Sequence, residues 1–306
     1  MTVENAAEKW GVTARRVREL CEAGYVIGAV KANGVWSVPE TSPKPVDSRR
    51  YRYGGIPKSL QADFMQMEAL KAELAAMRPL TDGEKRALRE NFLIDYTYHS
   101  NAIEGNTLTI SETAMVLGGM TIGEKPLKDH LEAIGHRDAF LYLEESLKEG
   151  VEITETFIKE LHYLVLNYSP EDRGRYRRVP VFITGADHTP PQPFMVGPMM
   201  EDWVREIAKS KLNALVAAAK FHILFEAIHP FIDGNGRTGR LLANFMLMRG
   251  GYLPISIKYE NRRAYYEAFG AYHRDHDDGV EMIRIFIASE RARLEEYLGI
   301  LRQVQT

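Results

Sequence analysis

HPFIDGNGRTGR, residues 229–240, is the stretch from which most of the remaining chain can be interpreted. It combines an imidazole, His229, with a carboxylate, Asp233, and two arginines. Two glycines flank Asn235, so the backbone there can adopt left-handed angles and turn several amides toward one point. The N-terminus of a helix behind such a loop binds anions. The stretch therefore indicates a site for a phosphate group.

A helix is expected on each side of this stretch. Leu215 to Ile228 is mostly apolar and predicts a buried helix. Pro230 ends it, because proline disfavours helical geometry in the preceding residue. Arg237 opens the next helix and shares a face with Arg240, three residues further on. The site is thus expected at the junction of two helices.

Helical periodicity extends over most of the chain from residue 59 onward. Thr81 to Glu84 predicts a capping box for a helix that runs toward Ser100. In 176–193, alternating Val179, Val181 and Ile183 precede a turn and prolines, which indicates a short exposed hairpin or flap. The expected fold class is mainly α. Other helices are expected over 59–77, from 111, and over 128–149, 154–166, 199–210, 237–249, 262–273 and 281–301.

Residues 1–42 resemble a small winged helix-turn-helix module. Helical spacing over Val3–Trp10 and from Thr13 to Cys21 precedes a hairpin signal at Asn33-Gly34. The second helix would present Arg15, Arg16 and Arg18 to DNA. Five basic and five acidic side chains in residues 1–40 fall short of the usual basic surface of a DNA-binding protein, so docking or a structural role stays open. Residues 43–58, rich in proline and glycine, predict a linker.

Three other interpretations of the central stretch are weaker. The glycine spacing from Gly234 formally matches a dinucleotide fingerprint, but no strand precedes it. A P-loop needs a lysine after its last glycine, and Arg237 stands there. His222, Glu226 and His229 have a spacing that suits zinc, which keeps a metal-dependent hydrolase as an alternative.

Bulk composition narrows the setting of the protein. The formal net charge is −3 over 306 residues, so binding to nucleic acid or lipid must be local. Cys21 is the one cysteine, and neither a signal-like N-terminus nor a membrane-spanning apolar run appears. We therefore expect a cytoplasmic protein without membrane contact.

Residues 229–240 resemble the signature of the Fic (filamentation induced by cAMP) family, HxFx(D/E)GNGRxxR, at every defined position. The resemblance implies a Fic-type helical bundle over residues 110–306 that moves AMP from ATP to a hydroxyl of a target protein. His229 would be the general base toward a Ser, Thr or Tyr hydroxyl. Asp233 would hold Mg²⁺ on the phosphates.

The resemblance also implies a set of nucleotide contacts. Backbone amides of the glycine loop would bind the α-phosphate, and the two arginines would bind the outer phosphates. The flap resembles the family's target-binding hairpin, which would hold the substrate chain as an added strand. Two tyrosines resemble residues that line the adenine pocket, with ordinary helix packing as the alternative. The implied set is Asp233, Gly234, Asn235, Gly236, Arg237, Thr238, Gly239, Arg240, Ile183 and Thr184 of the flap, and the tyrosines Tyr265 and Tyr266.

A second motif, Ser100-Asn-Ala-Ile-Glu104-Gly105, resembles the family's inhibitory pattern (S/T)xxxE(G/N). It precedes the signature in the position typical of relatives with an N-terminal inhibitory helix, here within residues 59–109. Ser100 and Glu104 lie one turn apart on one helix face. The resemblance implies that Glu104 pairs with Arg240 and prevents it from orienting the γ-phosphate. A surface helix pair of Glu104 is the alternative.

The sequence therefore predicts a protein adenylyltransferase that uses ATP and Mg²⁺, is inhibited by Glu104 through Arg240, and is also suited to removing AMP. One alternative is a nucleotide-sensing transcription regulator that uses residues 1–42, and the other is the metal-dependent phosphate hydrolase. Expected partners are an unidentified target protein, DNA through the N-terminal module, and a second copy of the chain, since relatives often dimerise.

Overall fold

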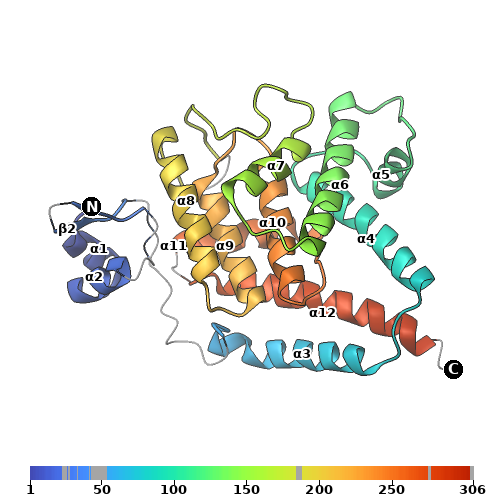
Figure 1. The fold of residues 1–306 in the computed structure, drawn as a ribbon, viewed down its shortest axis with the longest axis horizontal. Coiled ribbons are helices and arrows are strands. Elements are labelled where there is room, and N and C mark those ends of the chain that lie inside the picture. Colours follow the sequence, from blue (N-terminus) through green and yellow to red (C-terminus); the bar gives the residue numbers. More distant parts are fainter. Residues whose placement is uncertain are drawn as a thin grey trace.

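The computed structural model describes residues 1–22, 26, 28–32, 34–40, 42, 54–183, 188–274 and 277–303. Over these residues the chain is predominantly α-helical, as predicted (Figure 1). Strands occur there only as a small antiparallel hairpin near the N-terminus. The helices that follow the N-terminal module are α3 (Gln61–Ala76), α4 (Asp82–Ile103), α5 (Ile110–Leu117), α6 (Leu127–Lys148), α7 (Glu155–Val165), α8 (Pro193–Lys209), α9 (Ala214–Ile228), α10 (Asn235–Arg249), α11 (Arg262–Arg274) and α12 (Val280–Gln303), with short 3-10 turns at Lys58–Leu60 and Tyr259–Asn261.

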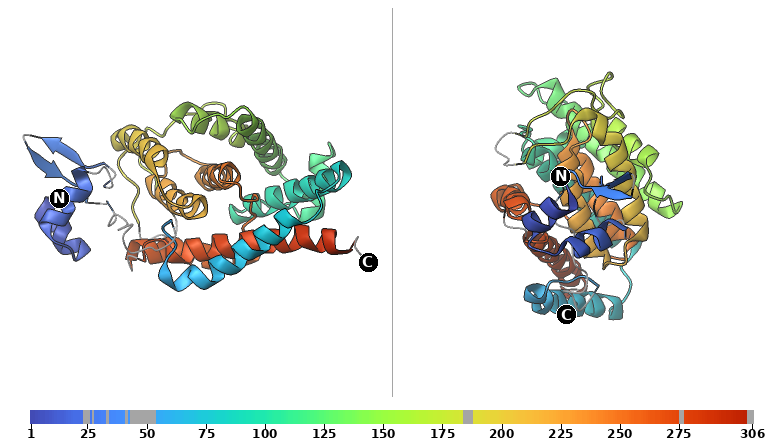
Figure 2. Two further views of the ribbon diagram at one scale, coloured as in Figure 1. Left: turned by 60° about the horizontal axis from the view of Figure 1, so that its bottom comes forward. Right: turned by 90° about the vertical axis from the view of Figure 1, so that its left-hand side faces the viewer.

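The antiparallel neighbours α9 and α10 occupy the centre of the bundle (Figure 2). One apolar cluster joins them to α3, α11 and α12, and a second joins them to α4, α6, α7 and α8. Helix α9 contributes Val216 and Ile223 to the first cluster and Phe221 and Phe225 to the second, so it is apolar on both sides. The loop between α9 and α10 is therefore held by a rigid support.

Helix α4 carries the proposed inhibitory motif at its C-terminal end. Its start is the predicted capping box, in which Thr81 Oγ1 accepts from the Glu84 amide and Glu84 accepts from the Thr81 amide. The helix then runs past Ser100 to Ile103 and packs against α6 and α10. This places the end of α4 beside the start of α10.

The N-terminal module has its own small core. Helices α1 (Val3–Trp10) and α2 (Ala14–Glu22) pack with the hairpin of β1 (Val30–Ala32) and β2 (Val35–Ser37) around Trp10 and Val17. Two helices and two strands are present where the sequence predicted them, while the winged helix-turn-helix assignment stays a prediction and Asn33 lies outside the described residues. The module contacts the bundle where the Gly28 amide donates to Asp202 of α8 (3.1 Å).

The structure differs from the prediction in the segment before α8. No strand is present in residues 176–183 or 188–192, so the expected hairpin is not formed in the part of the flap that is described. Pro180, Pro190 and Pro191 lack the amide hydrogens that strand pairing needs. Helix α8 begins at Pro193, six residues before the predicted start, because proline is well accommodated at the first helical position.

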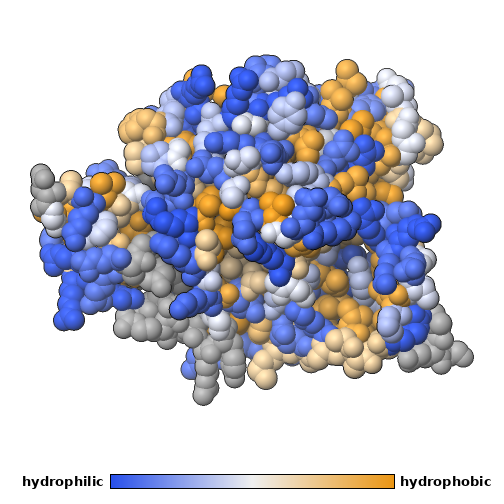
Figure 3. Space-filling view, viewed as in Figure 1, coloured by the Kyte–Doolittle hydropathy of each residue, from blue (hydrophilic) through white to orange (hydrophobic). Residues whose placement is uncertain are grey.

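On the molecular face seen in Figure 3, apolar side chains are interspersed with polar ones. Within the described ranges, no helix is both long and apolar enough to cross a membrane.

Candidate active site

His229 ends helix α9 in an unusual backbone conformation. It is the C-cap residue, with φ 50° and ψ 60°, and its amide donates to the Phe225 carbonyl (2.9 Å). Left-handed angles are uncommon for a residue with a side chain and occur mainly where the surrounding structure enforces them. Here the Phe225 carbonyl holds the His229 amide and Arg177 holds its carbonyl (2.8 Å), so the imidazole has a defined position at the helix end.

The loop after His229 is held by the side chain of Asn235. Its Oδ1 accepts from the Phe231 amide (2.8 Å) and its Nδ2 donates to the Phe231 carbonyl (2.9 Å). Gly234, with φ 76°, is the N-cap of α10 and requires the freedom of glycine. The Gly234 amide donates to Asp233 Oδ1 (2.6 Å), while the amides of Asn235 and Gly236 belong to the first turn of a buried helix, and their binding to phosphate stays a prediction.

His162 of α7 supports the same loop from behind. Its ring stacks on Phe231, with centroids 3.6 Å apart. The Gly174 amide donates to Nδ1 (2.9 Å), so the proton is on Nε2, which donates to the Asp233 carbonyl (2.9 Å). Burial lowers the pKa of His162 to about 4, and the ring is therefore neutral at pH 7.

A cleft of about 680 Å³ opens in front of this loop. Most of the predicted site residues line it: Glu104, Ile183, His229, Asp233, Gly234, Asn235, Gly236, Arg240, Tyr265 and Tyr266. Glu226, which the sequence indicated only as part of a zinc spacing, also lines it, and residues that the sequence did not single out complete the wall: Phe182, His188, Ala227, Ile232, Phe269, Gly270, His273 and Arg274. Thr184 lies outside the described residues.

Glu104 forms the predicted ion pair with Arg240. Arg240 is 3% exposed, and its Nη2 donates to Glu104 Oε1 (2.8 Å) and to the Ser100 carbonyl (2.7 Å), while Nε donates to Ser100 Oγ (3.0 Å). Burial alone would lower the pKa of Arg240, but Tyr265 and Glu104 raise it above its ordinary value. A Cβ atom at Gly236 would lie 2.1 Å from Glu104 Oε1, so the glutamate carboxylate rests against the glycine loop itself.

His229 and Glu226 form an uncharged pair at the bottom of the cleft. Burial lowers the pKa of His229 to about 4. Burial, together with the negative charge of Glu104, raises the pKa of Glu226 to about 8. His229 Nδ1 and Glu226 Oε2 are 3.7 Å apart. At neutral pH the imidazole is thus free to accept a proton.

The two tyrosines have different environments. Tyr265 is 1% exposed, and its hydroxyl lies 2.6 Å from His222 Nε2 and accepts a long bond from Arg240 Nη1 (3.4 Å). Tyr266 is half-exposed and donates to the Ile103 carbonyl (2.9 Å). Tyr265 is therefore a packed residue of the protein interior, whereas the ring of Tyr266 is accessible at the rim of the cleft.

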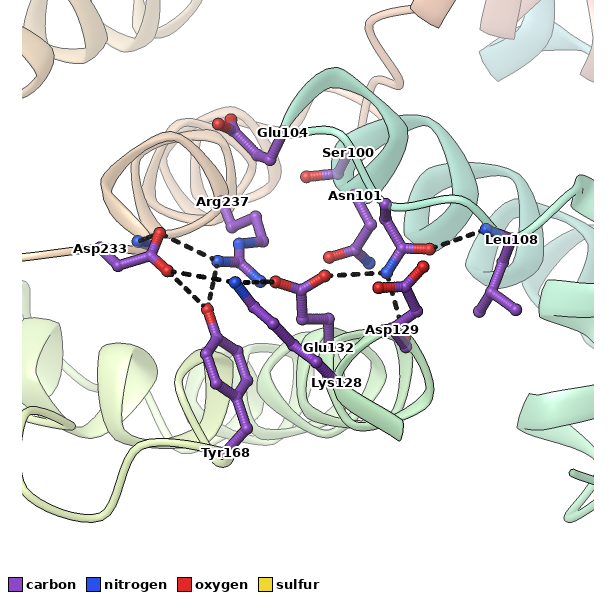
Figure 4. A network of polar contacts seen from close by, with 12 residues as sticks. Ser100, Asn101, Glu104, Leu108, Lys128, Asp129, Glu132, Tyr168, Asp233 and Arg237 are labelled. Atoms are coloured by element: carbon purple, nitrogen blue, oxygen red, sulfur yellow. Dashed lines mark hydrogen bonds and ion pairs between the residues drawn. The ribbon is translucent and has the colours of Figure 1, made fainter. Parts of the chain in front are cut away.

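Asp233 and Arg237 belong to a second polar network (Figure 4). Asp233 accepts from the Tyr168 hydroxyl (2.7 Å) and the Gly234 amide (2.6 Å), and its side chain is 49% exposed. Arg237, expected to bind the outer phosphates, is 1% exposed and does not line the cleft. It donates to Tyr168 (3.0 Å) and pairs with Glu132 (3.0 Å). Burial opposes ionisation of Asp233, but Arg237 and Tyr168 lower its pKa below its usual value.

The donor atoms suit a hard cation bound together with phosphate. Asp233 brings one accessible carboxylate to the cleft, and Mg²⁺ commonly takes one or two carboxylates and completes its shell with phosphate oxygens and water. In the described ranges no three His, Cys, Asp or Glu side chains lie together so as to hold a metal ion. His222, Glu226 and His229 therefore do not form the ligand group that the zinc interpretation requires, because His222 contacts Tyr265 instead.

Three other predicted residues lie beside or behind the cleft wall. Thr238 and Gly239 are buried in α10. A Cβ at Gly239 would lie 2.7 Å from Glu226 Oε1, which explains a glycine there. Gly105, with φ 93°, allows the chain to turn directly after Glu104.

Arg177 is a site-supporting residue that sequence reasoning missed. Its guanidinium is buried and donates to the carbonyls of His229 (2.8 Å), Pro191 (2.6 Å), Val179 (3.3 Å) and Ile228 (3.4 Å). Burial lowers its pKa from the ordinary value. It lies among several arginines in sequence, and nothing in the local pattern distinguishes it from them.

The arginines expected to contact DNA are engaged within the N-terminal module. Arg15 (3.1 Å) and Arg16 (3.2 Å) pair with Glu19, and Arg18 pairs with Glu4 (2.9 Å). These are partly exposed pairs of small individual stability. DNA binding therefore stays a prediction.

The fold and site define a class of protein: a helical domain in which a neutral histidine faces a glycine loop at the N-terminus of a buried helix. Residues 152–247 match the Fic/DOC family. The protein adenylyltransferase Fic of Nematostella vectensis is 36% identical over 83% of this chain, and that of Drosophila willistoni is 39% identical over 72%. The structure of Fic-1 (residues 134–508) from C. elegans matches with a TM-score of 0.71 and 30% identity, covering 80% of this chain and 73% of that one. The chain belongs to the Fic/DOC family.

The chain spans 61% of the Nematostella protein and 45% of the Drosophila protein.

Proposed function

We propose that this chain transfers AMP from ATP to a hydroxyl group of a target protein. The hydroxyl oxygen attacks the α-phosphorus, the bond to pyrophosphate breaks, and His229 takes the hydroxyl proton. The observation that carries this proposal is a neutral, largely shielded imidazole, 20% exposed, that lines the same cleft as residues 234–236. The similarity of the chain to the protein adenylyltransferases of Nematostella and Drosophila also supports it.

The remaining cleft residues have complementary roles. The amides of 234–236 stabilise negative charge on the α-phosphate, and Arg240 orients the outer phosphates. Asp233 would hold Mg²⁺, which neutralises phosphate charge when bound. Tyr266 at the rim is suited to pack against adenine, and the exposed Phe182 and Val179 of the flap are suited to contact a target chain.

The inhibitory role of Glu104 follows from two contacts. Its carboxylate takes a hydrogen bond of Arg240 and rests against Gly236. A γ-phosphate cannot use the same guanidinium hydrogen, and a second negative charge at the loop repels phosphate. ATP therefore binds with its α-phosphate out of line for attack.

Replacement of Glu104 tests both the activity and its inhibition. Glu104→Gly should raise self-labelling by ATP carrying a radioactive α-phosphate about tenfold or more, which corresponds to about 1.4 kcal/mol of competition at Arg240. Glu149→Gly, at the exposed C-cap of α6, is the matched control, because Glu104 is the C-cap of α4. Equal labelling of wild type and Glu104→Gly contradicts inhibition. No labelling of the variant itself or of any protein in a lysate contradicts the transferase.

Removal of AMP is a second activity of the same cleft. The Glu104 side chain is 32% exposed, lines the cleft, and bonds Arg240 through Oε1. Its carboxylate can therefore orient a water molecule toward a phosphodiester bound at the loop. Wild type incubated with an AMP-modified target and Mg²⁺ should release AMP, and Glu104→Gly should not.

DNA binding by residues 1–42 and a homodimer stay predictions. A regulator that only senses nucleotide would bind DNA of its own promoter in a mobility shift and form no covalent adduct with ATP, even as the Glu104→Gly variant. For a dimer, exposed Ile110, Met115, Met120 and Leu127 around α5 offer apolar surface.

A further inference from the structure

Arg237 lies between two carboxylates rather than in the cleft. Its guanidinium contacts Asp233 at 3.3 Å and Glu132 at 3.0 Å, with the Tyr168 hydroxyl beside both (Figure 4). The Arg237 side chain is 1% exposed and that of Glu132 is 8% exposed, so their contact is shielded from water, whereas the Asp233 side chain is 49% exposed. How strongly Arg237 pulls on Asp233 therefore depends on its other partner.

That other partner, Glu132 of α6, also holds the chain just beyond Glu104. Its side chain is 8% exposed, and the Asn106 amide group donates to its Oε2 (2.9 Å) while Oε1 faces Arg237. Lys128, one turn away, adds a weaker contact at 3.6 Å. One buried carboxylate thus joins the Asp233 loop to the segment that carries Glu104.

Asn106 closes the end of α4. Its backbone amide donates to the Asn101 carbonyl (3.1 Å), its Nδ2 also donates to the Asp129 carbonyl (3.0 Å), and its Oδ1 accepts from the Leu108 amide (3.0 Å). Asn106 is two residues after Glu104, with the left-handed Gly105 between them. The direction in which Glu104 leaves the helix is therefore fixed by contacts of Asn106.

We propose that Glu132 is a positioning residue that acts through two contacts: the first arm is its contact with Arg237, and the second arm is its contact with Asn106. Through Arg237 it keeps the Asp233 carboxylate available to the cation of a nucleotide. The buried Glu132 carboxylate partly neutralises the Arg237 guanidinium, so that Arg237 attracts Asp233 less strongly. Through Asn106 it holds Glu104 on Arg240. This proposal rests on the proposed function, and it makes cation binding and inhibition depend on one side chain of α6.

The first arm is tested with Glu132→Gln, which keeps the acceptor for Asn106 and removes the charge beside Arg237. Titration of Mg²⁺ into the full chain, with an ATP analogue that has a methylene group between the α- and β-phosphates, should show affinity for Mg²⁺ reduced about tenfold or more. Binding of the analogue without Mg²⁺ should be unchanged, whereas a merely damaged fold would weaken both. If Glu132→Gln does not fold, Glu132→Asp, which keeps the charge but shortens its reach toward Arg237, tests the same arm. Unchanged affinity for Mg²⁺ overturns the proposal.

The second arm is tested with Asn106→Ala, which leaves Arg237 and its partners intact. Hydrogen exchange over residues 101–108 should accelerate, and self-labelling should rise in the wild-type background but not in Glu104→Gly. Unchanged exchange and labelling overturn this arm. The Mg²⁺ titration and the exchange measurement need no transfer, so their failure is distinguishable from failure of the transferase itself.

Discussion

At the scale of single residues, burial determines the chemistry of the cleft. His229 and Glu226 are both neutral at pH 7, since burial moves the pKa of the first to about 4 and that of the second to about 8. Arg240 is more deeply buried than either residue yet stays charged, because Glu104 and Tyr265 partner it. The cleft therefore contains both an unprotonated His229, which can act as a general base at neutral pH, and a positively charged Arg240, which can bind phosphate.

The lowered pKa of His229 predicts an unusual acid limb of activity. The folded pKa is below the ordinary value of 6.5, so the imidazole keeps its free base form as pH falls through 6.5 and gains a proton only toward about 4. With Glu104→Gly, kcat/KM for labelling should therefore stay level down to about pH 5. Half-maximal activity near pH 6.5 contradicts this assignment.

His229→Ala supplies the control for that pH profile. Transfer should fall by a factor of about 100 or more, since general base catalysis is lost, while nucleotide binding persists.

At the scale of elements, the site joins a rigid pair of helices to a segment without regular structure. Helices α9 and α10 are enclosed by two apolar clusters, and the loop between them is tied by Asn235. Residues 176–183 instead depend on Arg177, whose guanidinium bridges the flap, Pro191 and the His229 carbonyl. The flap is therefore positioned by one buried side chain rather than by strand pairing.

Arg177→Ala should separate target modification from nucleotide binding. Loss of the buried donors leaves carbonyls unpaired and should lower the free energy of unfolding by about 1–3 kcal/mol. Labelling of target proteins should fall more than ATP affinity, because the glycine loop keeps its own supports.

Arg178→Ala is the matched control for this experiment, since that neighbouring arginine is exposed. Equal effects of the two substitutions on target labelling would contradict the role of Arg177.

At the scale of the whole molecule, the N-terminal module has an apolar cluster of its own and contacts α8. Its apolar core shares no residue with the two clusters of the bundle. Gly28 reaches Asp202, and Pro39 and Met199 lie close to the same glycine. Because the module has its own apolar core, we predict that it can be released without loss of the bundle.

Asp202→Ala should release it. The variant loses the acceptor of the Gly28 amide, so small-angle scattering should show a larger radius of gyration, while self-labelling in the Glu104→Gly background stays the same. Glu145→Ala, which removes an acid of a comparable (i, i+3) pair on α6, is the control. An unchanged scattering profile would show that other contacts hold the module.

The helical class, the helix ends at Thr81 and His229, and the glycine loop could all be predicted from the amino-acid sequence. These depend on local rules: capping oxygens, proline sterics, glycine angles and the 3.6-residue period act within a few residues. The start of α8 and the missing strands of the flap were not predictable in this way, because prolines suit both a loop and a first helical turn.

Tertiary structure alone decided which charges meet. The motif spacing placed Arg237 and Arg240 on one helix face. Only the packing of α10 against α4 and α6 determines that Arg240 pairs with Glu104 in the cleft and that Arg237 pairs with Glu132. Likewise, only the fold brought Arg177, 52 residues before His229, to the carbonyl of that histidine. Such pairings depend on burial and on distances between elements, and no local pattern along the chain encodes them.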